Sequence, residues 1–368
     1  MSEQFRELLQ KVGSGEHTHK DLTRSEAATA ARMMLQGEAT PAQIGAFLIA
    51  HRIKRPTAVE LAGMLDAYDE LGPQLEPLPD ADKEVVVLGV PYDGRSRTAP
   101  ISQITALLLA VSGLRVIMHG GNRMATKYGI PAWEIWKSLG LYFDELALAD
   151  LQSLLVQTGL TFIYIPKHFP QTEPLVTYRD QIGKRPPLAT LELIWSPYKQ
   201  KGHQIAGYVH PPTEATMRET FKLRGESKYT LVKGLEGSCD LRLSQTTIVA
   251  VSDPESSEGF DYLKATPREY GLQGKDVAIE SEAQLLTEIE QVVQGKESKL
   301  MQAAIWNGGF YLWRCGVCDN ISSGINKAEE LLKSSSLEHK VEEMKAVIKS
   351  KINSSHFAVS PPGVQTPG

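Results

Sequence analysis

The chain has 368 residues, of which 42% are hydrophobic, and its 39 Lys and Arg against 44 Asp and Glu give a net charge of -5. A chain of this size forms one large domain with a smaller companion more readily than a string of small modules. The slightly acidic balance excludes a whole-molecule attraction to nucleic acid or anionic membranes, although it leaves room for a local basic patch.

The apolar runs and the cysteines predict a cytoplasmic protein without a membrane span. The longest apolar candidate, residues 104–114, is about half of the roughly 18–20 residues that a span requires. The N-terminus, MSEQFRELLQ, is charged and amphipathic, unlike a signal peptide. Three cysteines supply no disulfide framework, which is typical of a reducing compartment. Cys315 and Cys318 have redox or metal spacing but no second ligand pair, so we expect them to be structural.

The first 76 residues predict a small helical domain. Three segments, which begin at Thr23, Thr40 and Thr57, have the form of a capping box. In this motif the threonine hydroxyl accepts from the amide three residues later, and a Glu or Gln side chain reaches back to the cap amide. Apolar residues recur at helical spacing after each box, and short connections make the helices neighbours in a bundle. Helices near 170–190 are candidates to join this domain.

Residues 80–350 predict an α/β domain with a mostly parallel central sheet. Short apolar runs alternate with helical stretches, which favours parallel strands covered on both faces. The expected strands are 85–88, 115–118, 161–165, 204–209, 229–232 and 246–251. The expected helices are 102–112, 146–157, 213–223 and several between 280 and 350. Residues 353–368 carry Ser, Pro and Gly and are expected to form a flexible tail.

Two glycine-containing loops follow predicted strands, at residues 89–98 and 119–123. Ligands gather at the carboxyl ends of parallel strands, so both loops are candidates for a binding site. Glycine backbone and a following helix N-terminus favour an anion, and Arg95 and Arg97 add positive charge. Phosphate binding is therefore the functional hypothesis for both loops, and an ordinary turn is the alternative for each.

Six segments resemble motifs of one known family, in the same order, over about residues 5–345. Residues 89–102 lie where that family has G-T-G-G-D-G followed by N-I-S-T, and residues 119–129 resemble its K-H-G-N-R segment. The other matching segments are 35–48, 179–185, 233–240 and 306–312. By the order of these segments the chain resembles the anthranilate phosphoribosyltransferases and their nucleoside phosphorylase relatives.

The resemblance implies transfer of phosphoribose from phosphoribosyl diphosphate to an aromatic amine, by inheritance in tryptophan biosynthesis. Such a reaction requires a neutralised diphosphate and an acceptor held in line, and no covalent nucleophile, so no catalytic residue is assigned. The resemblance also implies a homodimer formed through the helical domain. It assigns phosphoribosyl diphosphate to Gly89, Asp93, Gly94, Ser102, His119, Gly120, Asn122, Arg123, Thr126 and Lys127, the acceptor to Arg179 and Arg185, and Mg²⁺ to Glu236 and Asp240.

Several motif positions depart from the family pattern. Two glycines of the first loop are lost, and Pro91 cannot donate an amide hydrogen bond. Met118 stands in place of a lysine, and Cys239 in place of the first acid of the metal pair. A thiol is a poor ligand for a hard cation, which weakens the prediction of Mg²⁺. The candidates to compensate for the lost charge are Arg95, Arg97 and Lys233.

Two other functions stay open beside the transferase. The first is a catalytically silent relative that binds nucleic acid in a groove lined by Arg52, Lys54 and Arg55 or by Lys199 and Lys201. The second is a nucleoside phosphorylase, which uses inorganic phosphate. Single residues also have structural alternatives: a turn cap for His119 and Asn122, and a solvated face for Arg179, Lys184 and Arg185.

Overall fold

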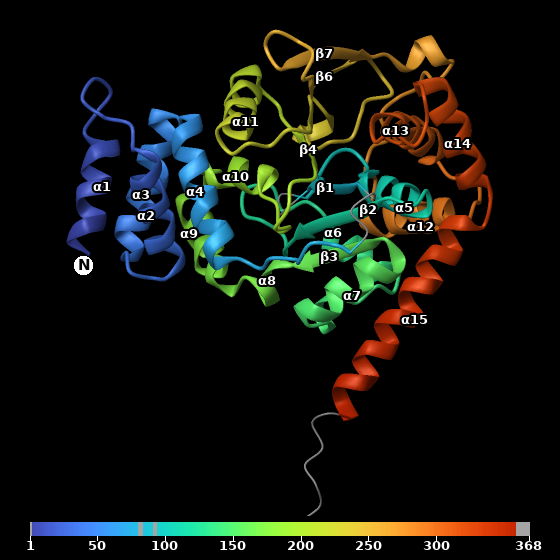
Figure 1. The fold of residues 1–368 in the computed structure, drawn as a ribbon, viewed down its shortest axis with the longest axis horizontal. Coiled ribbons are helices and arrows are strands. Elements are labelled where there is room, and N and C mark those ends of the chain that lie inside the picture. Colours follow the sequence, from blue (N-terminus) through green and yellow to red (C-terminus); the bar gives the residue numbers. More distant parts are fainter. Residues whose placement is uncertain (1, 80–83, 91–93, 358–368) are drawn as a thin grey trace, which may run out of the picture.

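A small helical part and a larger α/β part lie side by side in the computed structural model (Figure 1), which describes residues 2–79, 84–90 and 94–357. In the helical part α1 packs on α3 and α2 packs on α4. A later helix, α9 (Glu173–Ile182), also packs on α3, so a segment from 170–190 does lie against the bundle. The bundle helices are α1 (Glu3–Gly13), α2 (Arg24–Leu35), α3 (Pro41–Lys54) and α4 (Ala58–Leu71).

The three predicted capping boxes are confirmed, and each begins a helix where the sequence predicts one. Thr23, Thr40 and Thr57 accept from the amides of Glu26, Gln43 and Glu60, and each N3 side chain returns a bond to the cap amide. Local sequence therefore decides where α2, α3 and α4 start.

Glu60 does more than cap α4, because its fully buried carboxylate is the polar centre of the helical part. Oε1 accepts from the Leu22 amide at 2.9 Å, and Oε2 accepts from Lys54 Nζ at 2.8 Å. His51 Nε2 lies 3.4 Å from Oε2. Burial alone would raise the pKa of Glu60, but the neighbouring His51, the Leu22 amide and Lys54 outweigh burial and lower the pKa to about 2.

The α/β part is built on a seven-stranded sheet of order β3-β2-β1-β4-β5-β6-β7. The first five strands of this order, from β3 through β2, β1 and β4 to β5, are parallel. Strands β6 and β7 are antiparallel to their neighbours. The predicted fold class is therefore confirmed. The strands are β1 (Val85–Gly89), β2 (Arg115–Gly120), β3 (Leu160–Tyr164), β4 (His203–Gly207), β5 (Tyr229–Val232), β6 (Thr247–Ser252) and β7 (Phe260–Ala265).

Strand β7 is absent from the sequence prediction for a physical reason. It lies at the edge of the sheet and only Ala265 in it is buried, so it has no apolar run. Strands β1 to β5 have almost wholly buried residues, which is why their apolar runs are readable.

Helices cover both faces of the sheet (Figure 1). On the face toward the helical part, α10 (Leu188–Ile194) packs on β1, β4 and α4. On the far face, α5 (Ser102–Val111) packs against α12 (Glu282–Val293), α13 (Met301–Arg314) and α14 (Ile321–Lys333). The remaining helices are α6 (Ala132–Ser138), α7 (Leu148–Thr158), α8 (Ile165–His168), α11 (Pro211–Leu223) and α15 (Ser336–Phe357).

Ion pairs join the two parts where α11 packs on α4. Arg224, just after α11, donates to Asp66 at 2.7 Å and to Asp69 at 2.5 Å. Arg24 donates to the carbonyl of Leu223 at 3.1 Å. These contacts set the position of the helical part against the carboxyl ends of the strands.

The C-terminal prediction requires a correction. Helix α15 continues to Phe357, so residues 353–357, which the sequence places in a tail, are helical. The stretch from Ser336 to Ser360 contains no Gly or Pro, so nothing in the sequence stops the helix at residue 353. Residues 358–368 lie outside the described residues. Among the described helices, none is both long and apolar enough to cross a membrane.

We predict that Glu60→Gln destabilises the protein by about 3 kcal/mol at pH 7, because Lys54 loses its buried counter-charge. The folded-state pKa of Glu60 is depressed, so its contribution is present above the ordinary value of 4.5 and is lost as the pH falls toward about 2. The difference in the free energy of unfolding between variant and wild type must therefore be smaller at pH 3 than at pH 7. Urea unfolding at the two pH values measures this difference. Glu7→Gln, an exposed change in α1, is the control. An undiminished difference at pH 3 would contradict the prediction.

Candidate functional site

A cavity of about 740 Å³ lies between the helical part and the carboxyl ends of β1 and β4. Its wall includes Gly89 and Gly207, the last residues of these two strands. Apolar side chains such as Ile130, Ile135 and Leu193 make up part of the surface. The charged side chains among its described lining residues are Arg52, Arg55, Arg95, Lys127, Arg185 and Glu236. The cavity is therefore basic, although the chain as a whole is acidic.

Two glycines of this wall are required by close packing. A Cβ at Gly89 would lie 2.0 Å from the carbonyl oxygen of Leu193 in α10. A Cβ at Gly207 would lie 2.1 Å from the carbonyl carbon of Ser238. Gly207 thus lets the segment after β5 approach β4 and enter the cavity wall.

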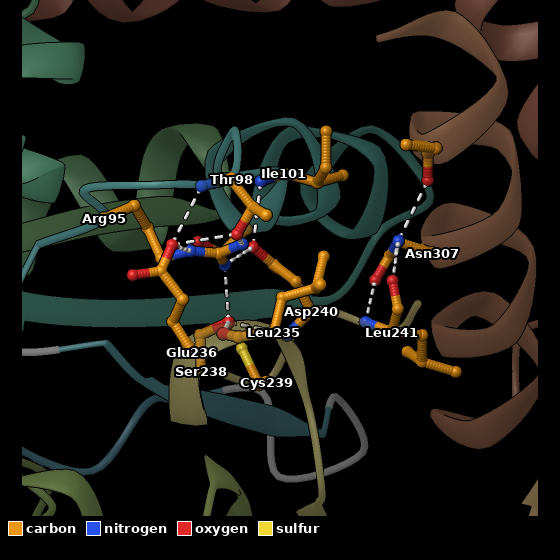
Figure 2. Close-up of polar contacts among 12 residues, drawn as sticks. Arg95, Thr98, Ile101, Leu235, Glu236, Ser238, Cys239, Asp240, Leu241 and Asn307 are labelled. Atoms are coloured by element: carbon orange, nitrogen blue, oxygen red, sulfur yellow. Dashed lines mark hydrogen bonds and ion pairs between the residues drawn. The ribbon is translucent and has the colours of Figure 1, made fainter. Parts of the chain in front are cut away.

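The first predicted loop turns into the cavity at Arg95. The Arg95 amide donates to the Ile130 carbonyl at 3.0 Å, and the Ile130 amide donates back at 2.9 Å. This pairing fixes the backbone, and the guanidinium is 95% buried and points toward the segment after β5 (Figure 2).

Arg95 makes a buried polar cluster with Thr98 of its own loop and with the segment after β5 (Figure 2). Its Nη1 donates to Asp240 Oδ2 at 2.8 Å and to Ser238 Oγ at 2.7 Å. Its Nη2 donates to Thr98 Oγ1 at 2.5 Å, and its Nε lies 3.5 Å from Glu236 Oε1. A buried guanidinium with this many acceptors is held in one orientation.

Glu236 is held in the same cluster by its own donors. Its Oε1 accepts from the amides of Arg97 and Thr98 at 3.0 and 2.9 Å. Lys127 Nζ lies 3.2 Å from its Oε2. Burial would raise the pKa of Glu236, but the Thr98 amide and the charge of Lys127 outweigh burial and hold the pKa well below its usual range. Glu236 is therefore a carboxylate at neutral pH.

Asp240 is fixed from the other side by α5 and α13. Its Oδ2 also accepts from the Ile101 amide at 3.0 Å, just before α5. Asn307, buried in α13, accepts from the neighbouring Leu241 amide at 2.7 Å (Figure 2). The Tyr311 hydroxyl donates to the carbonyl of Cys239. The segment 239–241 therefore has little freedom to move.

The residues present do not fit the Mg²⁺ that the family resemblance implies. Cys239 is buried, and burial raises the pKa of its thiol, so it is not a thiolate ligand at neutral pH. Asp240 Oδ2 and both oxygens of Glu236 already accept from cations and donors. Asp240 Oδ1 accepts no described hydrogen bond, but the described residues gather no group of three metal-ligating side chains. Arg95 contacts both carboxylates.

The predicted phosphate-binding residues divide into two sets. Gly89, Gly94, Ser102 and Lys127 line the cavity. The second loop, which follows β2, contributes no described lining residue before Lys127, so His119, Gly120, Asn122, Arg123 and Thr126 lie elsewhere. Asp93 lies outside the described residues.

The second loop instead carries structural contacts. His119 is 1% exposed and packs edge-on against Trp195 at 5.0 Å. Burial lowers the pKa of His119 to about 4, so the ring is neutral at pH 7. Asn122 accepts from the Tyr164 hydroxyl at 2.7 Å. Arg123 donates to Glu134 at 2.8 Å and also pairs with Glu282.

The two predicted acceptor residues also separate. Arg179 is 3% exposed and donates to Glu192 Oε2 at 3.0 Å, and it is not among the lining residues. Arg185 does line the cavity, and its carbonyl accepts from Arg52 Nη1 at 2.5 Å.

Several lining residues were not assigned from the sequence, among them Gln103, Ser238 and Tyr208. Tyr208 comes directly after β4, so its signal was the end of a third parallel strand. Arg55 and Glu236 are two of the four described non-glycine residues with positive φ, at 67° and 53°, and both line the cavity. Such strained backbone is characteristic of binding sites.

We predict that Asp240→Asn destabilises the protein by roughly 3 kcal/mol, because the buried Arg95 loses the nearer of its two carboxylate partners. Urea unfolding at pH 7 measures the loss, and the exposed Asp319→Asn serves as the control. A loss below about 1 kcal/mol, as for a surface pair, would show that Arg95 does not depend on this carboxylate.

Comparison with known proteins places this cavity in a family context. Residues 6–72 match the model of the glycosyl transferase family helical bundle domain, and residues 93–336 match that family's a/b domain. The chain is 27% identical over 314 residues to an uncharacterized protein of Aquifex aeolicus, which covers 84% of this chain and 93% of the relative. It is also 26% identical over 330 residues to the anthranilate phosphoribosyltransferase of Aromatoleum aromaticum. That alignment covers 88% of this chain and 93% of the relative.

Solved structures agree with this fold. The anthranilate phosphoribosyltransferase of Saccharomyces cerevisiae, in complex with PRPP and Mg, superposes with a TM-score of 0.79 at 18% identity over 95% of this chain and 99% of that one. The anthranilate phosphoribosyltransferase of Thermus thermophilus superposes with a TM-score of 0.75 at 20% identity, over 95% of this chain and 100% of that one. At this identity the structures establish the fold alone, whereas the two domain matches establish the family. The chain belongs to the glycosyl transferase family that pairs a helical bundle domain with an a/b domain, the family of the anthranilate phosphoribosyltransferases.

Proposed function

We propose that the protein transfers a phosphoribosyl group from phosphoribosyl diphosphate to an aromatic amine or a related acceptor. The observation that carries this proposal is the basic cavity at the strand ends, to which both domains contribute cationic side chains. A cavity of about 740 Å³ is large enough for phosphoribosyl diphosphate. Relatives across most of the chain are anthranilate phosphoribosyltransferases, which supports the same reaction.

The leaving diphosphate belongs at the end of β1. Lys127 and Arg95 bring positive charge there, and the N-terminus of α5 adds partial positive charge beside Ser102. As the bond between the anomeric carbon and diphosphate lengthens, negative charge grows on the leaving group. Cationic groups that are already in place stabilise that charge without reorganisation.

The acceptor belongs on the side of the helical domain. Arg52, Arg55 and Arg185 offer positive charge to an acidic acceptor, and proline and aliphatic side chains of the same wall offer an apolar surface to a ring. Because Arg179 is paired with Glu192 in the interior, we assign the predicted arginine role to Arg185.

Nucleic acid binding receives less support. Lys199 and Lys201, which the sequence places in a candidate groove, pair with Glu76 and Glu226. Lys54 pairs with Asp21 and with the buried Glu60. Carboxylates that neutralise these lysines weaken attraction to a phosphate backbone. A homodimer through the helical domain and a cytoplasmic location stay predictions, and light scattering after size exclusion measures the first.

Isothermal titration calorimetry with phosphoribosyl diphosphate tests the proposal. We expect binding by the wild-type protein, and an affinity at least about tenfold lower for Lys127→Met, because a half-buried cation beside the diphosphate is lost. The matched control is Lys199→Met, a surface lysine outside the cavity. Release of diphosphate with an aromatic amine as acceptor then tests transfer. No heat at millimolar ligand would contradict the proposal, and turnover with inorganic phosphate and a nucleoside would favour a phosphorylase.

A further inference from the structure

The cluster around Arg95 has the charge balance of a metal site without a metal. The carboxylates of Glu236 and Asp240 carry two negative charges, and Arg95 and Lys127, both in contact with them, carry two positive charges. A divalent cation between two carboxylates gives the same balance. Arg95 is almost fully buried, so its charge is a permanent part of this wall.

Both cations keep donors that the cluster does not use. A guanidinium has five N–H groups, and Arg95 directs two at Asp240 and Ser238 through Nη1 and one at Thr98 through Nη2. The Nε is buried and faces Glu236 at 3.5 Å, so the N–H that the cluster leaves over is the second one on Nη2. An ammonium has three N–H groups, and Glu236 is the described partner of Lys127. Both residues line the cavity, so a phosphate oxygen there has donors to meet.

We propose that Arg95, together with Lys127, takes the place of a divalent cation, so that this chain binds the diphosphate group without Mg²⁺. This inference rests on the proposed phosphoribosyl transfer and adds to it that the neutralising charge is built into the fold. It differs from the Saccharomyces cerevisiae relative, whose structure is a complex with PRPP and Mg.

A metal ion would have to displace Arg95 to reach the two carboxylates. That displacement breaks the contacts with Asp240, Ser238 and Thr98 and leaves a buried guanidinium without partners, which is costly. Mg²⁺ also demands near-octahedral oxygen ligands, and the buried thiol of Cys239 supplies none. The fold therefore favours its own cation over a bound one.

The first test compares the affinity for phosphoribosyl diphosphate in EDTA and in millimolar Mg²⁺. We expect the two dissociation constants of the wild-type protein to agree within about twofold. Arg95→Met, which removes the charge, is expected to bind at least about tenfold more weakly in EDTA and to recover affinity when Mg²⁺ is added. Wild-type affinity that rises about tenfold or more with Mg²⁺, or Arg95→Met that binds like the wild type in EDTA, overturns the proposal.

Two variants separate this effect from loss of folding. Arg218→Met removes another arginine that contacts two carboxylates, Glu214 and Glu219 of its own helix α11. Arg218 lies outside the cavity lining, so binding by this variant must stay at the wild-type level in both buffers. Arg95→Lys keeps the charge without the fork of donors, so we expect weaker binding that still ignores Mg²⁺. If Arg95→Met does not fold, the test rests on Arg95→Lys. If the affinity of Arg95→Lys for phosphoribosyl diphosphate then requires Mg²⁺, the proposal is overturned.

A direct metal titration judges the inference even if phosphoribosyl diphosphate does not bind at all. Mn²⁺, followed by its paramagnetic resonance signal, is titrated into the protein without substrate. We expect the wild-type protein to leave Mn²⁺ free and Arg95→Met to bind it at Glu236 and Asp240. Stoichiometric Mn²⁺ binding by the wild-type protein would show that the metal displaces Arg95. Absent substrate binding with free Mn²⁺ would refute the proposed function and the diphosphate binding inferred from it, and would uphold only the replacement of the cation by Arg95.

Discussion

The ion pair between Arg95 and Asp240 holds together segments that are far apart in the sequence. Arg95 comes from the loop after β1, and Asp240 from the connection after β5. Asp240 also accepts from the amide of Ile101, before α5, and the residue after Asp240 is bound to Asn307 in α13. One wall of the cavity thus depends on a buried charge that has to be matched, because an unmatched guanidinium in the interior is strongly destabilising.

The opposite wall of the cavity depends on how the helical domain packs against the α/β domain. Arg52 and Arg55 reach the cavity from the end of α3, and Arg185 reaches it from the segment that follows α9. Helix α9 packs on α3, and Arg224 clamps α4 to the α/β domain. The arginines of this wall are therefore placed by domain packing rather than by any one loop.

The two loops that the sequence predicts to bind phosphate lie in different surroundings. The first loop keeps its place at the cavity and brings an arginine into it. The second loop turns its side chains into the core and into ion pairs: His119 packs on Trp195 and Arg123 pairs with Glu134 and Glu282. The positive charge of the cavity therefore comes from Arg95 and Lys127 on one side and from Arg52, Arg55 and Arg185 on the other.

The sequence by itself determined the features that depend on local patterns. The capping boxes at Thr23, Thr40 and Thr57 set the helix starts, because a cap is satisfied within four residues. Buried runs such as 85–88 and 229–232 marked the parallel strands, because both faces of those strands are covered. Only the tertiary structure decided that Arg95 meets Asp240, across 145 residues, and that Arg185 rather than Arg179 reaches the cavity. Whether a charged side chain faces a ligand or a buried partner depends on long-range packing, and neither residue type nor spacing carries that information.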